Sequence, residues 1–338
     1  MKENGKYWPE ILERLSSIER RRGISPAEDL QLILSTGTDC LLNENQRIRP
    51  PSSKGGPGGL IRLKPEGYFV IVPDLHGRLD FFHAVMRWQG LSGKPVIADM
   101  EEGRAQVICV GDAFHSESRG QARWQKAVKE WSGGFKKHQQ MDNEMRENLG
   151  LLEMINIVKT TFPEQFHFLK GNHENIANER GEGNYPFRKY AFEGEMVKLW
   201  VQTFMGIDLF KTIYRWEKSL PLMAEGKDFL VTHAEPGREL SPDEVIDAYE
   251  HPEVIYSLTW TDNGQAEECS VAKTLQNFSM TCPESRIFGG HRAVFGNYAL
   301  RQEGRYVQIN KPRSWLIAAF TNMREFLPDE NIISLKKE

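Results

Sequence analysis

The amino-acid sequence predicts an α/β fold in which short buried strands alternate with helices. Five short apolar runs are typical of strands, and each leads into glycine or into a polar residue. Two of them flank a helical stretch, and this strand–helix–strand order implies a parallel pair. Other stretches carry apolar residues at helical spacing. The five runs are residues 67–73, 106–110, 166–169, 228–232 and 286–290.

The N-terminal part is predicted to be helical and to lie outside the main sheet. Residues 8–35 place apolar side chains among many charges, and Ser25-Pro26-Ala27-Glu28 is typical of a helix start. We expect this part to pack against the main domain or to act as a lid. The cluster Pro-Pro-Ser-Ser-Lys-Gly-Gly-Pro-Gly-Gly at 50–59 predicts a flexible connector, because no Lys-Ser/Thr pair follows it to form a phosphate loop. Residues 1–60 are therefore a helical extension and connector.

The main domain is predicted over residues 61–325, with two helical inserts and a C-terminal tail. Its first part is a strand near 68, a helix over 79–89 and a second strand ending at 111. Further helices are expected over 119–131, 142–159 and 191–217. The last part alternates around turns and predicts antiparallel strands between 287 and 309. The inserts are residues 113–150 and 241–280, and the tail is residues 326–338.

Composition and charge narrow the classes of protein. The formal net charge of -4 does not indicate a nucleic-acid partner, which usually requires a basic surplus. The four cysteines form no C-x-x-C pair, which fits a reducing compartment. The N-terminus has no apolar signal core, and no apolar stretch reaches the roughly 18–20 residues that span a bilayer. We expect a cytoplasmic protein without a membrane partner.

The strand ends carry the residues that predict chemistry. Each of the five runs leads into a side chain that binds metal ions, and together these offer carboxylate, amide and imidazole ligands without a thiolate. Such a set suits Mn, Fe or Zn and does not favour a calcium site. It exceeds the three or four ligands that one catalytic ion takes from protein, so we expect two divalent ions bridged by Asp112. The six ligands are Asp74, His76, Asp112, Asn172, His233 and His291.

A pair of ions about 3.5–4 Å apart is suited to hydrolysis of phosphate esters. It binds the phosphoryl oxygens and lowers the pKa of water to about 7, so hydroxide can attack in line at neutral pH. The leaving alkoxide then needs a proton. His173 follows the predicted ligand Asn172 and is the candidate general acid.

These motifs resemble the calcineurin-like metallophosphoesterase family. The resemblance is carried by Asp-x-His-Gly at 74–77, Gly-Asp at 111–112, Gly-Asn-His-Glu at 171–174, a lone His233 and Gly-His at 290–291. Within the family, Gly-Asn-His-Glu, Leu220-Pro221 and the run Leu-Thr-Trp-Thr-Asp at 258–262 resemble the phosphoprotein phosphatase (serine/threonine phosphatase) branch.

The resemblance implies a β-sandwich of two mixed sheets flanked by helices, with two metals at one edge. It also implies that Asp74 and His76 hold the first ion, that Asp112 bridges, and that His173 is the proton donor. The second ion would be held by Asn172, His233 and His291.

The sequence departs from this branch after Gly111-Asp112. The branch continues with x-Val-Asp-Arg-Gly, whereas this chain has Ala-Phe-His-Ser-Glu-Ser-Arg-Gly, so that Arg119 comes three residues late. Arg119 either clamps the substrate phosphate or caps the helix behind it. The aspartate that orients the catalytic histidine is missing, and Glu117 or His115 could replace it.

Other departures leave the substrate open. Ala234-Glu235-Pro236 follows His233 where the branch has Gly-Gly, so the floor of the pocket differs. Arg292 is a candidate for the second phosphate-binding arginine and is equally consistent with a structural role, and Asn172 is a further candidate substrate contact.

Three functions compete. The first is a dinuclear metal-dependent phosphomonoesterase, with serine/threonine protein phosphatase as one form. The second is a hydrolase of dinucleoside polyphosphates or other nucleotide anhydrides, whose bases would stack on aromatic residues of the inserts, although core packing also explains these residues. The third is a non-catalytic metal-binding interaction protein, which should have a broken ligand set. The aromatic residues are Phe114, Trp124, Trp131, Tyr249, Tyr256 and Trp260, and the histidines expected to be structural or exposed are His83, His138, His167 and His251.

Overall fold

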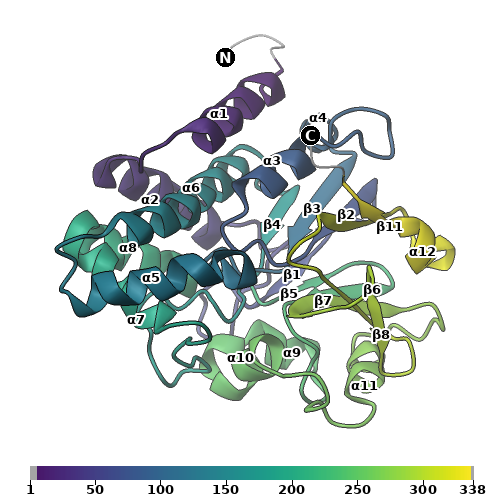
Figure 1. Cartoon of the computed structure of the whole chain (residues 1–338). Helices are drawn as coiled ribbons and strands as arrows, with labels where there is room; N and C mark the ends of the chain where they lie inside the picture. The colour runs from purple at the N-terminus through teal and green to yellow at the C-terminus, as the bar shows by residue number, and fades with distance from the viewer. Residues whose placement is uncertain (1–5, 336–338) are drawn as a thin grey trace.

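The chain folds into a β-sandwich of two mixed sheets with helices on both outer faces (Figure 1). This is a computed structural model, and it describes residues 6–335. The predicted α/β class and the two mixed sheets flanked by helices are both confirmed. Residues 1–5 of the predicted extension and residues 336–338 of the predicted tail lie outside the described part.

The five-stranded sheet has the order β11-β10-β2-β3-β4. Its central strands β2, β3 and β4 run parallel to one another, and β10 and β11 add antiparallel strands at one side. The expected βαβ unit is present, with α3 and α4 between β2 and β3. The bounds are β2 (Tyr68–Val72), α3 (Leu79–Arg87), α4 (Val96–Glu101), β3 (Ala105–Cys109), β4 (Phe166–Phe168), β10 (Leu316–Phe320) and β11 (Ile332–Ser334).

The six-stranded sheet has the order β1-β5-β6-β7-β9-β8. The sequence predicts antiparallel strands over 287–309, and this is only half right. β8 and β9 pair antiparallel, but β7 pairs with β9 in parallel because the β8–β9 hairpin folds back so that β9 lies beside β7. The bounds are β1 (Leu60–Arg62), β5 (Met223–Glu225), β6 (Phe229–Thr232), β7 (Arg286–Ala293), β8 (Ala299–Arg301) and β9 (Tyr306–Asn310).

Strand alternation divides the apolar side chains between two layers. Along β2, Tyr68, Val70 and Val72 pack under the helices, whereas Phe69 and Ile71 point between the sheets. This is the period of two expected of a strand buried on both faces. Between the sheets, phenylalanine rings from both sides are in contact: Phe69 lies 4.8 Å from Phe229, and Phe288 lies 5.2 Å from Phe320, between ring centroids.

Two groups of helices cover the outer faces (Figure 1). The larger group packs on the five-stranded sheet and includes the N-terminal helices, whose Leu15, Ile18, Leu30 and Leu34 are fully or almost fully buried in its core. The N-terminal helices thus pack against the main domain. Members of the larger group are α3 and α4 together with α1 (Trp8–Arg20), α2 (Ala27–Leu42), α5 (Gln121–Ser132), α6 (Gln139–Thr161), α7 (Glu193–Trp200) and α8 (Ile207–Lys218).

The smaller group covers the six-stranded sheet and forms the expected helical insert. It consists of α9 (Pro242–Ile246), α10 (Pro252–Thr259) and α11 (Ser270–Asn277). The single helix predicted over 191–217 is wrong, because the chain breaks at Gly206, whose φ of 89° is incompatible with a continuing helix. Near the C-terminus, α12 (Pro328–Asn331) precedes β11 within the stretch predicted as a tail.

Candidate active site

The ends of neighbouring parallel strands bring the six predicted ligands together. β2 leads to Asp74 and His76, and β3 leads to Asp112. Next in the same sheet, β4 leads to Asn172. In the other sheet, β6 leads to His233, and His291 lies in its parallel neighbour β7. This is the edge at which α/β sheets bind ligands, because the carboxyl ends of parallel strands meet there.

Unusual backbone geometry turns these side chains inward. His76, Asp112 and His291 have φ values of 46°, 57° and 62°, in the left-handed region that residues other than glycine rarely adopt. Such conformations cluster at functional sites, where the surrounding structure holds them. Gly290 is required beside them, because a Cβ atom there would lie 2.0 Å from Oδ1 of Asp74.

Two of the imidazoles present bare nitrogen lone pairs to the carboxylates. Nδ1 of His76 lies 3.2 Å from the carbonyl oxygen of Phe114, and Nδ1 of His233 lies 3.0 Å from that of Val110. A carbonyl only accepts, so each Nδ1 carries the proton and each Nε2 is unprotonated. Nε2 of His76 then faces Asp112 Oδ2 at 3.7 Å, and Nε2 of His233 faces it at 3.4 Å. Acceptors that converge without a proton between them repel unless a cation lies among them.

The amide of Asn172 completes one set of acceptors. Its Oδ1 lies 2.9 Å from Nε2 of His233 and 2.9 Å from Nδ1 of His291, and these two nitrogens are 3.3 Å apart. Asp112 Oδ2 lies on the same side, next to His233. Two nitrogens and two oxygens therefore point at one place, which is a ligand set that borderline divalent ions accept.

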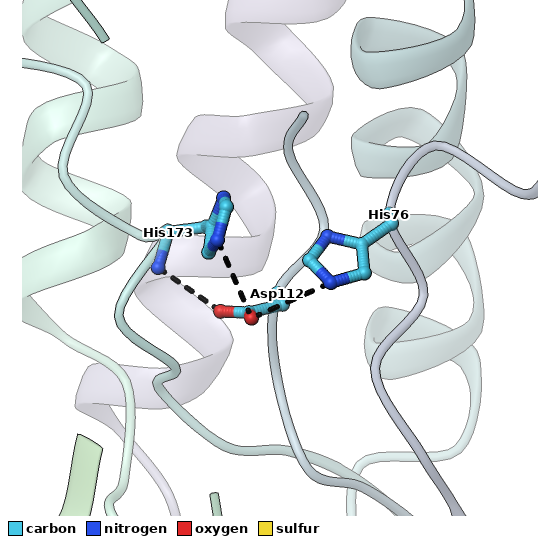
Figure 2. A group of neighbouring side chains, drawn as sticks. All are labelled: His76, Asp112 and His173. Atoms are coloured by element: carbon cyan, nitrogen blue, oxygen red, sulfur yellow. Dashed lines mark hydrogen bonds and ion pairs between the residues drawn. The ribbon is translucent and has the colours of Figure 1, made fainter. Parts of the chain in front are cut away.

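Asp112 lies between His76 and His173 (Figure 2), and it also belongs to a second cluster with Asp74 and His233. Its Oδ1 accepts the backbone N–H of His173 at 3.0 Å, which fixes the carboxylate plane. Its Oδ2 faces the imidazoles of His76 and His233 and lies 3.8 Å from Nε2 of His173. A single oxygen of Asp112 is thus within reach of both sets, as a bridging ligand requires.

Burial has large effects on the protonation of the site. It raises the pKa of Asp74 to about 7, and it raises the pKa of Asp112 well above its usual value, helped by the charges of Asp74 and Glu174. It also lowers the pKa values of His76 and His233 to about 3. Neutral imidazoles beside carboxylates that are costly to ionise fit cations, which would supply the charge that burial removes. The residues present therefore fit two divalent ions.

His173 contacts a second histidine. Its Nδ1 lies 2.7 Å from Nδ1 of His115, and both rings pack on Phe187, with centroids 3.8 Å and 5.0 Å away. Two imidazole nitrogens at this distance share one proton, so one donates and the other accepts. Glu117 points elsewhere and pairs with Lys189 at 2.5 Å. Burial, followed by the neighbouring His115, lowers the pKa of His173 well below its usual value.

The two candidate arginines are both held by carboxylates. Arg119 pairs with Glu147 at 2.7 Å and donates from Nη2 to the carbonyl oxygen of His76 at 3.0 Å, so it lies directly behind a ligand loop. Arg292 makes two bonds of 2.7 and 2.9 Å to the carboxylate of Asp262.

Sequence reasoning missed two residues that hold the ligand loops. The carboxylate of Glu174 accepts backbone N–H groups from Asp112, Ala113 and Gly171 at 2.9, 2.7 and 2.7 Å, and so ties together the loops after β3 and β4. The amide of Asn310, at the end of β9, donates to Oδ2 of Asp74. Glu174 stands inside the Gly-Asn-His-Glu motif and could have been found there, whereas no local pattern marks Asn310.

The remaining histidines lie apart from the ligand set. His83 pairs with Glu19 at 2.6 Å and His138 with Asp142 at 2.8 Å, and His251 lies 3.6 Å from Glu253. His167 is buried within β4.

Most of the insert aromatics pack in the interior. Phe114 and Trp124 are buried in the core, and Tyr249 donates to the carbonyl oxygen of Leu220. Trp131 packs against Phe192. By contrast, Tyr256 and Trp260 contact Tyr185, and both tyrosines are partly exposed.

A model of the calcineurin-like phosphoesterase family matches residues 67–311. The chain belongs to this family. The calcineurin-like phosphoesterase is therefore a hydrolase that acts on phosphoesters, as its strand-end ligands indicate. A sequence search of curated proteins finds no relative of it.

One solved structure, with a TM-score above 0.5, has the same fold as the phosphoesterase. A protein serine/threonine phosphatase from Saccharomyces cerevisiae matches with a TM-score of 0.54 at 14% identity, covering 92% of this chain and 89% of that one. A cold-active protein-tyrosine phosphatase from a psychrophilic Shewanella species matches with a TM-score of 0.48 at 15% identity, covering 82% of each chain. Within residues 6–335, no helix is long and apolar enough to cross a bilayer.

Proposed function

We propose that this phosphoesterase hydrolyses phosphomonoesters with two divalent ions bound at the strand ends. The convergence of the six side chains, with Oδ2 of Asp112 between His76 and His233, is the observation that carries the proposal. Asp74 and His76 would hold one ion, and Asp112 would bridge both. Asn172, His233 and His291 would hold the other. Mn, Fe or Zn suits these ligands, and when bound such ions neutralise phosphoryl oxygens and lower the pKa of water.

The chain's own residues would orient the ester and protonate the leaving group. We assign the proton to Nε2 of His173, which lies 3.8 Å from Asp112 Oδ2 and so faces the centre of the site. Donation from Nδ1 of His115 to Nδ1 of His173 would set this tautomer, so His115 takes the place of the missing aspartate. Arg119 and Arg292 would bind phosphoryl oxygens, from positions that Glu147 and Asp262 hold.

Phosphorylated serine or threonine in proteins is the substrate that we favour. Its support is the Gly-Asn-His-Glu motif of the serine/threonine phosphatase branch and the likeness of the fold to the yeast phosphatase. One observation favours nucleotide anhydrides instead. Tyr185, Tyr256 and Trp260 form a partly exposed aromatic cluster, and the loop of Asp262 links it to Arg292 beside His291. The four cysteines are free, which supports a cytoplasmic location.

The proposal is tested by metal analysis together with turnover of an aryl phosphate. Active protein should contain two ions per chain. His173→Ala should keep both ions while kcat falls by roughly 10²–10⁴-fold, the contribution typical of general acid catalysis. His115→Ala should lower kcat by less and should shift the pH profile, because the donor that sets the tautomer of His173 is lost. His138→Ala is the matched control, because this histidine lies outside the ligand set. Active protein with one ion or none would overturn the proposal.

A further inference from the structure

A large polar cleft adjoins the loop that carries His76. Its volume is about 980 Å³, within the range of pockets that enclose small ligands. Gly77, which follows His76 directly, forms part of its wall, and so does Arg119, which donates to the carbonyl oxygen of His76. The cleft therefore begins where the metal-binding loop ends.

Three of the arginines that line the cleft bind no carboxylate within residues 6–335, unlike Arg119, which pairs with Glu147. Arg146 donates from Nη1 to the carbonyl oxygens of Glu19 and Arg21, at 3.3 and 2.7 Å, and within residues 6–335 its Nε and Nη2 have no partner. Arg78 likewise donates to carbonyl oxygens, among them those of Leu75 and Ser314. Arg313 is exposed and shows no partner in the described part of the chain. Carbonyl acceptors leave a guanidinium with its full charge.

The acidic residues of the cleft, in contrast, are engaged. Both oxygens of Glu147 receive bonds from arginines: Arg119 and Arg123 reach Oε2, and Arg123 also reaches Oε1. Glu19 pairs with His83 at 2.6 Å, and Oδ1 of Asp80 accepts the backbone N–H of Phe81 at 2.9 Å. Four arginines (Arg78, Arg119, Arg146 and Arg313) line the cleft against three carboxylates (Glu19, Asp80 and Glu147), so its formal charge is positive.

Part of the cleft comes from outside the region that matches the family. Arg313 and Ser314 follow that region, Ser334 lies in β11, and Glu19 lies in α1. These walls lie outside the matched residues, so the family motifs do not determine them and the cleft is suited to selecting a substrate.

We propose that the cleft binds a second anionic group of the substrate, carried on the part of the molecule that leaves. This inference rests on the proposed phosphomonoesterase function. Arg146 and Arg313 would receive a carboxylate or a second phosphate while the ester phosphate lies at the metal-binding residues. The preferred substrates are therefore phosphoesters with a further acidic group close by, such as a phosphorylated residue flanked by glutamates.

Binding of non-hydrolysable peptides to the manganese-loaded protein tests the proposal. The probes carry a phosphonate analogue of phosphoserine flanked by glutamates or, in the matched peptide, by glutamines. We expect the glutamate peptide to bind at least about tenfold more tightly, with a preference that declines with salt. Arg146→Gln together with Arg313→Gln should reduce this ratio to about one. Arg313→Gln alone, at an exposed position that folding does not depend on, should reduce it in part. Arg324→Gln, also exposed but outside the cleft, should leave it unchanged.

Two nucleotides identify the source of the anion. Competition by adenosine 3′,5′-bisphosphate and by adenosine 5′-monophosphate is compared in the same proteins. The second group is a phosphate if the bisphosphate competes better than the monophosphate in a way that depends on Arg146 and Arg313, while the glutamate and glutamine peptides bind equally. Equal binding of both members of each pair, or a preference that the arginine variants keep, would overturn the inference.

Turnover of an aryl phosphate is measured in the same proteins to separate this inference from the proposed function. If the protein turns over the aryl phosphate but shows no preference for the second anion, only the role of the cleft is refuted. If the arginine-dependent preference is present but turnover is absent, only the proposed function is refuted.

Discussion

The two sheets contribute to the ligand set in different ways. The five-stranded sheet supplies both carboxylates and the loops that carry them, and Glu174 cross-links these loops through three backbone N–H groups. The six-stranded sheet supplies His233 and His291, each held by fewer bonds: His233 by the carbonyl oxygen of Val110, and the backbone of His291 by Asp74. The ligand loops of the five-stranded sheet are thus held by hydrogen bonds among themselves. The two histidines of the six-stranded sheet are held instead by groups of the five-stranded sheet.

This difference teaches where a metal ion should matter most. The loops of the five-stranded sheet have hydrogen bonds that do not involve the ligand atoms, so they should keep their shape without metal. In the six-stranded sheet, the unprotonated Nε2 of His233 faces Oδ1 of Asn172, and Nδ1 of His291 lies against the same oxygen, so the positions of these imidazoles should depend on a cation. Four predictions test whether the ligands of the two sheets, called the five-stranded half and the six-stranded half of the site, respond differently.

The largest effect is expected from Asp112→Asn, which weakens the one oxygen shared by both halves. We expect kcat/KM to fall by roughly 10²–10³-fold or more, because the amide has no charge to bridge two cations. Metal content measured by mass spectrometry should fall below two ions per chain. Asp329→Asn, at an exposed carboxylate, serves as the control. Full activity with two ions in Asp112→Asn would show that the halves are not joined through this residue.

His291→Ala should affect the six-stranded half alone. The second ion loses one nitrogen ligand, while Asp74, His76 and Asp112 remain for the first. We expect metal content near one ion per chain and a loss of activity of roughly 10²-fold. Loss of both ions would mean that the two halves bind metal as one unit, contrary to the comparison.

Glu174→Gln tests the cross-link of the five-stranded half. A glutamine offers one oxygen where the carboxylate accepts three N–H groups, so metal affinity should fall by about 10–100-fold. Activity should return at saturating manganese. Glu130→Gln is the matched control, because this carboxylate accepts the backbone N–H groups of Gln140 and Met141 and binds no ligand loop. If both variants lose metal affinity equally, Glu174 has no special role.

The smallest effect is a pH dependence confined to the carboxylate half. Burial raises the pKa of Asp74 to about 7, so the folded metal-free protein holds a proton that the unfolded chain releases from about pH 4. The contribution of Asp74 to the free energy of unfolding is therefore fully present below about pH 4 and is lost as the pH rises towards 7. Asp74→Asn should raise the melting temperature of metal-free protein at pH 8 and change it little at pH 4. An equal change at both pH values would contradict this.

The convergence of the six candidate ligands could be predicted from sequence because each of them follows an apolar run. Asp112 and Asn172 stand directly after glycine at strand ends. Parallel pairing brings these ends together independently of the conformation of the connecting segments. Nothing comparable marks β10, whose run from Leu316 to Phe320 ends without a ligand, and that strand was missed.

The partner of His173 could not be chosen from sequence. His115 and Glu117 stand two residues apart, and either could reach the imidazole. Both residues have left-handed backbone conformations, with φ values of 66° and 35°. The directions of their side chains therefore cannot be obtained from the periodicity of a strand or a helix. The packing of Phe187 against both imidazoles, from far along the chain, then holds His115 in place.

The phenylalanine rings between the sheets have a consequence for how the molecule melts. Phe69 and Phe320 belong to one sheet, Phe229 and Phe288 belong to the other, and their edges and faces interlock. Neither sheet can open without exposing the rings of both, so calorimetry should record a single cooperative transition even after chelation has emptied the metal site.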